Sequence, residues 1–190
     1  TYFKDRISAE IRLPDAIERR LLCPFHYFGV ADSISLKDVT WKAGHYDTEE
    51  LTNLYTLESY GANKRADIIL DAVERYTADM RDVKGLGFCV SQRHAAFMAD
   101  YMNSRNIPSM ALDANSPKED RDMAKHRLET GKLTFLFTVD LFNEGVDIPA
   151  VNTVLFLRPT NSMTVFIQQL GRGLRLHKDK DCLTVLDFVA

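Results

Sequence analysis

The sequence predicts an α/β fold in which a mostly parallel sheet is covered by helices on both faces. From Gly85 onward, short apolar runs alternate with segments of helical periodicity. Five runs have this strand character: Leu86–Val90, Met110–Leu112, Phe135–Val139, Val154–Leu157 and Leu183–Val189. Continuous apolar strands are typical of parallel sheets buried on both faces, with right-handed crossovers.

The bulk composition fits one soluble globular domain with an appendage. The chain has 190 residues, 45% of them hydrophobic and 27% charged. It has no apolar run near bilayer length and no signal-peptide pattern, so we expect a cytoplasmic protein without a membrane partner. The scattered Cys23, Cys89 and Cys182 predict reduced thiols. A net charge of −3 predicts weak, salt-sensitive nucleic-acid binding by this chain alone.

Before Gly85 the elements are less regular. Leu13–Ile17 predicts a short helix, Cys23–Val30 a strand, and Asp32–Tyr46 an irregular segment in which Trp41 is packed. Cys23 and His26 have C-x-x-H spacing, but no second ligand pair accompanies them, so no metal site is predicted.

Two helices are predicted between this segment and Gly85. Asp47 opens the first. The second begins at about Asn63 and carries an apolar stripe: Ala66, Ile69, Leu70 and Val73. Its other face is expected to be solvated and holds the charged residues Lys64, Arg65, Asp67, Asp71, Glu74 and Arg75.

The following helices have clear start signals. Ser91 is expected to cap a helix that buries Ala95, Met98, Tyr101 and Met102. Ser116–Glu119 predicts a capping box with proline at the first helical position, and Gly131 ends that helix. His94, His126 and His177 show no partner spacing and are expected to face solvent.

Polar segments follow the predicted strands. They are Ser91, Asp113, the Asp140–Asp147 turn and the Arg158–Ser162 turn. Ligands of parallel α/β sheets gather at the carboxyl ends of strands. The candidate chemistry is therefore expected on one rim of the sheet.

The stretch Phe166–Arg175 carries the strongest phosphate-binding pattern. It is predicted to form the front end of a helix with Arg172 and Arg175 on one face, where two guanidiniums can grip a phosphate. Gly171 and Gly173 each cost a helix roughly 1 kcal/mol, which suggests that a backbone or ligand comes close. The alternative is a solvated helix end with ordinary surface arginines.

Together with Thr134–Pro149, this stretch resembles motifs V and VI of superfamily 2 helicases, G-x-D-I-P followed by Q-x-x-G-R-x-x-R. The resemblance implies a RecA-like three-layer domain, the second of two motor domains, with an N-terminal helical segment. It covers Gly85–Ala190 well and Cys23–Tyr76 loosely. We therefore expect residues 1–24 to link to a first motor domain, residues 25–190 to form the helicase C-terminal domain, and residues 47–78 to be a helical insertion.

The resemblance also implies roles for ATP-side residues. Arg172 and Arg175 match the arginines that contact the ATP γ-phosphate, and Gln168 the residue that links the nucleotide and nucleic-acid sites. Gly145 and Asp147 match the G-x-D of motif V, which approaches the nucleotide sugar. Asp147 could instead be plain turn chemistry, and Gln168 a helix-surface amide.

On the nucleic-acid side, Phe88–Ser91 resembles motif IV, so Ser91, Gln92 and Arg93 are expected to touch the nucleic-acid backbone. Gln169 stands where DEAD-box proteins have arginine. The run from Gly171 to Arg175 is more similar to helicase subunits of restriction systems, which favours DNA.

The chain lacks the phosphate loop G-x-x-x-x-G-K-[ST] and a D-E-x-[DH] tetrad. ATP and Mg²⁺ are therefore expected to be held mainly by the first RecA-like domain of the same parent chain, and this chain alone is expected to be inactive. Two other hypotheses remain at this point. One is a non-catalytic RecA-like adaptor for protein contact, and the other is a different phosphate-binding α/β enzyme such as a kinase or phosphatase.

Overall fold

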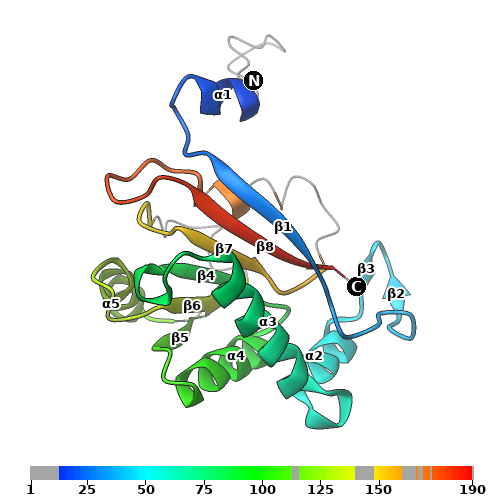
Figure 1. The fold of residues 1–190 in the computed structure, drawn as a ribbon. Coiled ribbons are helices and arrows are strands. Elements are labelled where there is room, and N and C mark those ends of the chain that lie inside the picture. The colour runs from blue at the N-terminus through cyan, green and yellow to red at the C-terminus, as the bar shows by residue number, and fades with distance from the viewer. Residues whose placement is uncertain are drawn as a thin grey trace, which may run out of the picture.

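A six-stranded sheet forms the centre of the computed structural model, which describes residues 13–112, 116–139, 148–159, 166, 169–171 and 173–189. The strands are β1 (Phe25–Ala31), β4 (Gly85–Phe88), β5 (Ser109–Leu112), β6 (Phe135–Thr138), β7 (Thr153–Phe156) and β8 (Leu183–Val189). Their order is β1-β8-β7-β4-β6-β5, and every neighbouring pair is parallel (Figure 1). The predicted parallel α/β fold is confirmed.

Helices cover both faces of this sheet. The first face carries α3 (Ala62–Tyr76) and α4 (Gln92–Ser104). The opposite face carries α5 (Lys118–Glu129) and the helical turn around Leu170. Successive residues of β6 alternate between the two cores, since Phe135 and Phe137 pack under α3 and α4 while Leu136 packs toward α5. The three-layer arrangement is therefore the expected one.

Shorter elements surround the sheet. They are α1 (Leu13–Glu18), the two-residue strands β2 (Trp41–Lys42) and β3 (His45–Tyr46), α2 (Thr48–Thr56) and the 3₁₀ turns η1 (Glu58–Tyr60) and η2 (Met80–Asp82). Asp47 caps α2 as predicted, because its carboxylate accepts from the N–H groups of Glu49 and Glu50. None of the helices in the described ranges is both long and apolar enough to cross a bilayer.

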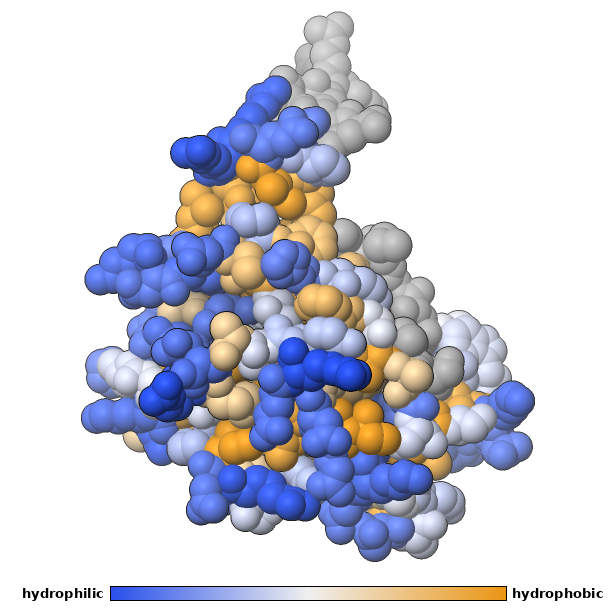
Figure 2. Space-filling view, viewed as in Figure 1, coloured by the Kyte–Doolittle hydropathy of each residue, from blue (hydrophilic) through white to orange (hydrophobic). Residues whose placement is uncertain are grey.

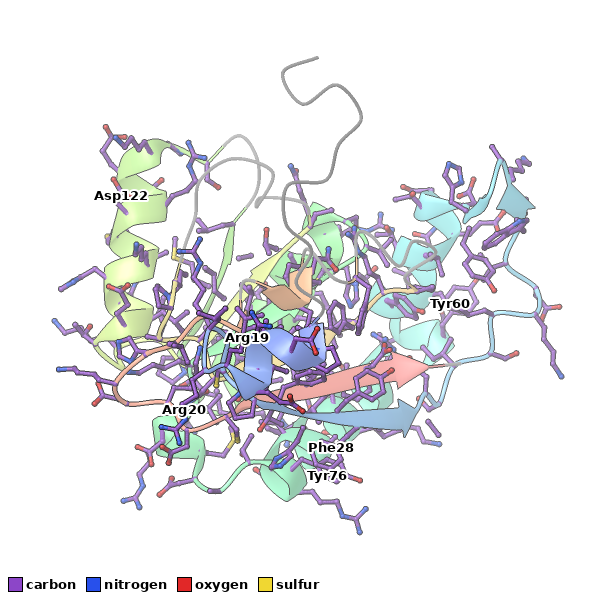
Figure 3. All side chains as sticks on the ribbon, turned by 90° about the horizontal axis from the view of Figure 1, so that it is seen from above. Arg19, Arg20, Phe28, Tyr60, Tyr76 and Asp122 are labelled. Carbon is purple, nitrogen blue, oxygen red and sulfur yellow. The ribbon has the colours of Figure 1, made fainter. Side chains whose placement is uncertain are left out.

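The edge strand β1 is only partly covered. Phe28 stacks on Tyr76 of α3 with ring centroids 4.2 Å apart (Figure 3). The Tyr27 hydroxyl donates a 2.6 Å hydrogen bond to Asp187 of β8, and burial, together with this bond, raises the pKa of Tyr27 to about 12. Apolar side chains show at the surface between α1 and the start of β1, where Leu21 is exposed (Figure 2).

Two glycines of β4 make room for two phenylalanines of β6. Gly85 pairs with Phe135 and Gly87 with Phe137 in the ladder. A Cβ added to Gly85 or Gly87 would lie 2.1 or 2.4 Å from the ring of its partner. The central strands therefore fit together only because one of them lacks side chains on this face.

Several local predictions need correction. The segment from Asp32 to Tyr46 contains the β2–β3 hairpin, and Trp41 contacts Tyr46 but is 52% exposed, so it is not a buried packing residue. Pro117, rather than Ser116, lies at the N-cap of α5, and it makes no side-chain cap bond. A proline has no side-chain acceptor, and the helix begins one residue later than the prediction.

Candidate functional site at the carboxyl ends of the strands

The sheet has a topological switch point between β4 and β7. These strands are neighbours, but the chain after β4 enters α4 on one face while the chain after β7 returns toward Leu170 on the other. The Leu157 N–H donates to the Phe88 carbonyl at 3.0 Å just beyond the paired residues. Open α/β sheets bind ligands at such a point. The predicted rim is confirmed for Ser91 and Arg158, while Asp113 and the 140–147 turn lie outside the described residues.

Ser91 is a helix cap and is fully engaged within the chain. Its Oγ accepts from the His94 N–H at 3.2 Å. The Thr52 hydroxyl lies 2.8 Å from Ser91 Oγ and 2.7 Å from the Thr48 carbonyl. Since Thr52 has one hydroxyl hydrogen and the carbonyl can only accept, Ser91 donates to Thr52. The predicted cap is confirmed, and a contact of Ser91 with a ligand would have to use its backbone.

Gln92 and Arg93 are exposed at the start of α4. The first N–H groups of a helix have no acceptor within the helix and favour anions. Arg93 donates to the Asn53 amide oxygen and lies 3.5 Å from the Glu49 carboxylate. Both partners belong to α2, so this helix holds the arginine beside the switch point.

Arg65 is the principal residue that sequence reasoning placed wrongly, because it is 2% exposed rather than solvated. Its Nε donates to Asp32 Oδ2 at 2.8 Å, and its Nη2 donates to the Leu157 carbonyl at 3.2 Å. The guanidinium carbon also lies 3.8 Å from the ring centroid of Tyr55. This one side chain thus ties together the ends of β1 and β7 and the helix α2.

His94 lies beside this arginine and is also buried, contrary to the expectation that it faces solvent. The ring fills the space beside Tyr55, with centroids 5.1 Å apart, and Nδ1 accepts from the Val90 N–H at 3.3 Å. Burial, with a smaller effect from the charge of Arg65, holds the pKa of His94 well below 6.5. Burial likewise raises the pKa of Tyr55 to about 12. The floor of the switch point therefore contains the Arg65–Asp32 ion pair beside the neutral rings of Tyr55 and His94.

The arginine-bearing stretch lies differently from the prediction. Phe166, Gln169–Gly171 and Gly173 are helical, and Arg175 follows the helix as an exposed residue. The Leu174 carbonyl accepts from the Cys23 N–H at 2.7 Å, just before β1 begins. Arg175 thus lies toward the amino ends of β1 and β8, so the expectation of a helix front at the carboxyl-end rim is wrong for it. The physical reason is that the chain runs back along the sheet from Phe166, which stacks on Phe156 at the end of β7, to Leu174, which bonds to Cys23 before β1.

The two glycines of this stretch face opposite ways. A Cβ on Gly173 would lie 2.7 Å from Leu183 Cδ2, so this backbone rests directly on β8. A Cβ on Gly171 would meet no atom of the described residues within 4 Å. Close approach of the sheet explains Gly173, whereas Gly171 marks an open side of the helix. Arg172, Gln168, Gly145 and Asp147 lie outside the described residues, and their roles stay predictions.

The side chain of Lys180 holds the end of the arginine-bearing stretch in place. Its Nζ donates to the carbonyls of Pro149, Val151 and Gly173 at 2.8, 3.0 and 2.9 Å. The ammonium group is therefore bonded to the chain entering β7 and to the chain leaving the arginine-bearing helix. It fixes the two segments relative to each other.

The cysteines are free thiols. Cys23 Sγ bonds to the Pro24 and Asp181 carbonyls at 3.3 and 3.7 Å, and Cys182 Sγ lies 3.9 Å from His26 Nδ1. Within the described part of the chain, no group of three or more His, Cys, Asp or Glu side chains is placed to hold a metal ion.

The six-stranded parallel sheet, its helices on both faces and its switch point define a RecA-like α/β domain, and solved structures share this fold. The Escherichia coli DEAD-box protein SrmB, bound to RraA, matches with a TM-score of 0.56 at 16% identity, over 88% of this chain and 77% of that chain. The C-terminal part of the Fun30 ATPase domain matches with a TM-score of 0.58 at 14% identity, over 74% of this chain and 50% of that chain.

Residues 66–177, more than half of the chain, match the family described as "Helicase conserved C-terminal domain". The chain belongs to this family, as the C-terminal RecA-like domain of superfamily 2 helicases. IRC3 of Saccharomyces cerevisiae, whose name describes an ATP-dependent helicase, is 25% identical over 97% of this chain and 26% of its own length. A 51.5 kDa protein of a Lactococcus phage is 25% identical over 89% of this chain and 35% of its own length. The chain thus spans about a third or less of these relatives.

Proposed function

We propose that this chain is the second motor domain of an ATP-dependent helicase or translocase. A first RecA-like domain of the same parent chain holds ATP and Mg²⁺. The second motor domain, formed by the present chain, completes the nucleotide site and binds nucleic acid. Family membership supports the motor assignment. The observation that carries the site is the open flank at Gly171, four residues from the exposed Arg175.

On the nucleotide side, Arg172 and Arg175 act as arginine fingers on the γ-phosphate. Gly145, Asp147 and Gln168 couple the nucleotide to the nucleic-acid grip. Because Arg175 lies toward the amino ends of β1 and β8, the nucleotide approaches the flank of the arginine-bearing helix and not the mouth of the sheet. None of the described residues comes within 4 Å of a Cβ placed on Gly171, and a phosphate fits on this side of the helix in the proposal.

On the nucleic-acid side, the start of α4 contacts the sugar–phosphate backbone. Arg93 supplies a charge, and the N–H groups that begin α4 supply donors, with Gln92 beside them. Ser91 contributes through its backbone because its hydroxyl is already engaged. The nucleic acid is DNA in this proposal, and the parent protein works in the cytoplasm.

The deciding experiment measures nucleic-acid-stimulated ATP hydrolysis by the full-length parent protein. Arg175→Ala is expected to lower turnover about 10³-fold, because a finger stabilises charge on the transferring phosphate. Arg75→Ala is the matched control, since Arg75 is also exposed but lies on the last turn of α3.

Unchanged turnover in Arg175→Ala removes the finger assignment. Absence of hydrolysis by the intact parent protein, with DNA or RNA, favours a non-catalytic adaptor domain instead. The isolated chain is expected to bind ATP poorly and to hydrolyse none, since most phosphate ligands come from the first domain. If calorimetry shows micromolar binding of ATP to the isolated chain, the proposal that the first domain supplies most of the phosphate ligands is contradicted.

A further inference from the structure

A small hairpin projects from the rim of the sheet. β2 and β3 pair through Trp41 and Tyr46, and the turn between them is Ala43–Gly44 with φ of +50° and +83°. Two positive φ values in a two-residue turn are the mark of a type I′ hairpin, which matches the natural strand twist. Trp41 packs edge-on against Tyr46 with ring centroids 4.7 Å apart, yet remains 52% exposed. The indole is therefore held in place and presented to solvent.

The base of the hairpin is fastened to α2. The Asp47 N–H donates to the Thr40 carbonyl at 2.8 Å. The N–H and hydroxyl of Thr40 donate to the Glu50 carboxylate at 2.7 and 2.8 Å. These bonds join both ends of the hairpin to the first turns of α2, so the position of the hairpin relative to this helix is fixed.

The hairpin stands next to the proposed backbone contact at α4. Tyr46 packs on a small apolar cluster that includes Leu51, Tyr55 and Val90. Val90 immediately precedes Ser91, and α2 also bonds to Ser91 and Arg93. In Figures 1 and 3 the hairpin lies beyond the carboxyl end of β8, at the same end of the sheet. A strand of nucleic acid lying on Arg93 therefore passes near Trp41.

The tip of the hairpin carries a positive charge, although acidic residues stand on both sides of its base. Of these, Asp47 caps α2, Glu50 accepts from Thr40 and Glu49 lies 3.5 Å from Arg93, while Asp38 is exposed two residues before Thr40. Between Thr40 and Tyr46 the sequence carries Lys42 and His45 and no acidic residue, and both side chains are exposed. The tip thus offers an aromatic face with a positive charge beside it.

We propose that the hairpin is a base-stacking arm for single-stranded nucleic acid. Trp41 stacks on an unpaired base, and Lys42 lies near the flanking phosphate. An aromatic ring stacks on any exposed base and tolerates any sequence, which suits a motor that moves along a strand. This inference rests on the proposed function, because it extends the nucleic-acid track that begins at α4.

The test uses the full-length parent protein, an ATP analogue, and single strands of DNA and RNA. Trp41 is the single tryptophan of the 190 residues, so the difference between wild-type and Trp41→Phe emission isolates its signal. Stacking is expected to quench that signal as single strand is added. Trp41→Ala is expected to weaken single-strand binding about 5- to 100-fold. Tyr60→Ala, which removes a 55% exposed ring on η1, is the matched control and leaves the affinity unchanged (Figure 3).

A second variant checks the arm without touching the ring. Lys42→Ala is expected to lower the slope of log affinity against log salt by about one, with Trp41 quenching retained. If Trp41→Ala binds single strands with wild-type affinity while Arg93→Ala binds them more weakly, the base-stacking role of the hairpin is refuted but the proposed function is not. Equal quenching by duplex and single strand also refutes the base-stacking role, because paired bases offer no free face. Failure of the wild-type protein to bind any strand overturns both proposals.

Discussion

Replacing Arg65 with methionine tests whether the buried ion pair organises the switch point. The two side chains are 2% and 1% exposed, and Arg65 Nε lies 2.8 Å from Asp32 Oδ2. Removing one partner of a buried pair leaves an uncompensated charge and costs about 3–5 kcal/mol. The Leu157 carbonyl loses a donor as well. For a domain of this size, that loss corresponds to a fall in Tm of roughly 6–20 °C.

Urea unfolding followed by circular dichroism measures the free energy of unfolding. Lys64→Met is the matched control, since Lys64 precedes Arg65 on α3 but is exposed, and its change is expected to stay within about 0.5 kcal/mol. Asp32→Asn alone is expected to destabilise strongly, and the Arg65→Met/Asp32→Asn pair to cost less than the sum of the single changes. A loss below about 1 kcal/mol for Arg65→Met, or strict additivity in the cycle, refutes the reasoning.

Three further predictions concern His94, the two glycines of the arginine-bearing helix, and Lys180. Because the folded pKa of His94 lies well below 6.5, the unfolded chain takes up a proton before the folded one as the pH falls. The contribution of His94 to the free energy of unfolding is therefore complete above pH 6.5 and falls by up to about 1.4 kcal/mol per pH unit below it, and parallel urea titrations of His94→Asn are expected to show a smaller pH dependence. Gly173→Ala is expected to lower the free energy of unfolding by about 1–3 kcal/mol through overlap with Leu183, whereas Gly171→Ala leaves it equal or higher; equal losses at both glycines contradict the packing assignment. Lys180→Met leaves three carbonyls without their donor and is expected to cost more than about 2 kcal/mol in thermal melts; a neutral result means that water replaces the ammonium group.

The strands of the sheet could be predicted from the sequence because they are continuous apolar runs. Leu183–Val189 was predicted to the residue, and the other predicted strands lie within two residues of those observed. The position of the candidate site at one rim of the sheet could be predicted from the direction of the strands alone. Placing Ser91 at the start of α4 was equally local, because a cap acts within its own first turn.

Long-range partners could not be predicted in the same way. Arg65 appeared to belong to a solvated face, since its partner Asp32 is 33 residues away in the chain. One signal was available: Arg65 is three residues after Ala62 and four before Ile69, both buried, so helical spacing puts it on their side. The hairpin was missed because Ala43–Gly44 lacks the usual Asn-Gly or Asp-Gly pair. Arg175 was misplaced because packing of the chain against β1 decides where its helix stops.

The fit of Gly85 and Gly87 against Phe135 and Phe137 has an evolutionary consequence. The space between β4 and β6 is shared by each pair, so volume gained on one strand must be given up on the other. Among relatives that keep this sheet, we expect correlated substitutions at these pairs, with larger residues in β4 accompanied by smaller ones in β6. Such covariation would record the register of the two strands in the sequences themselves.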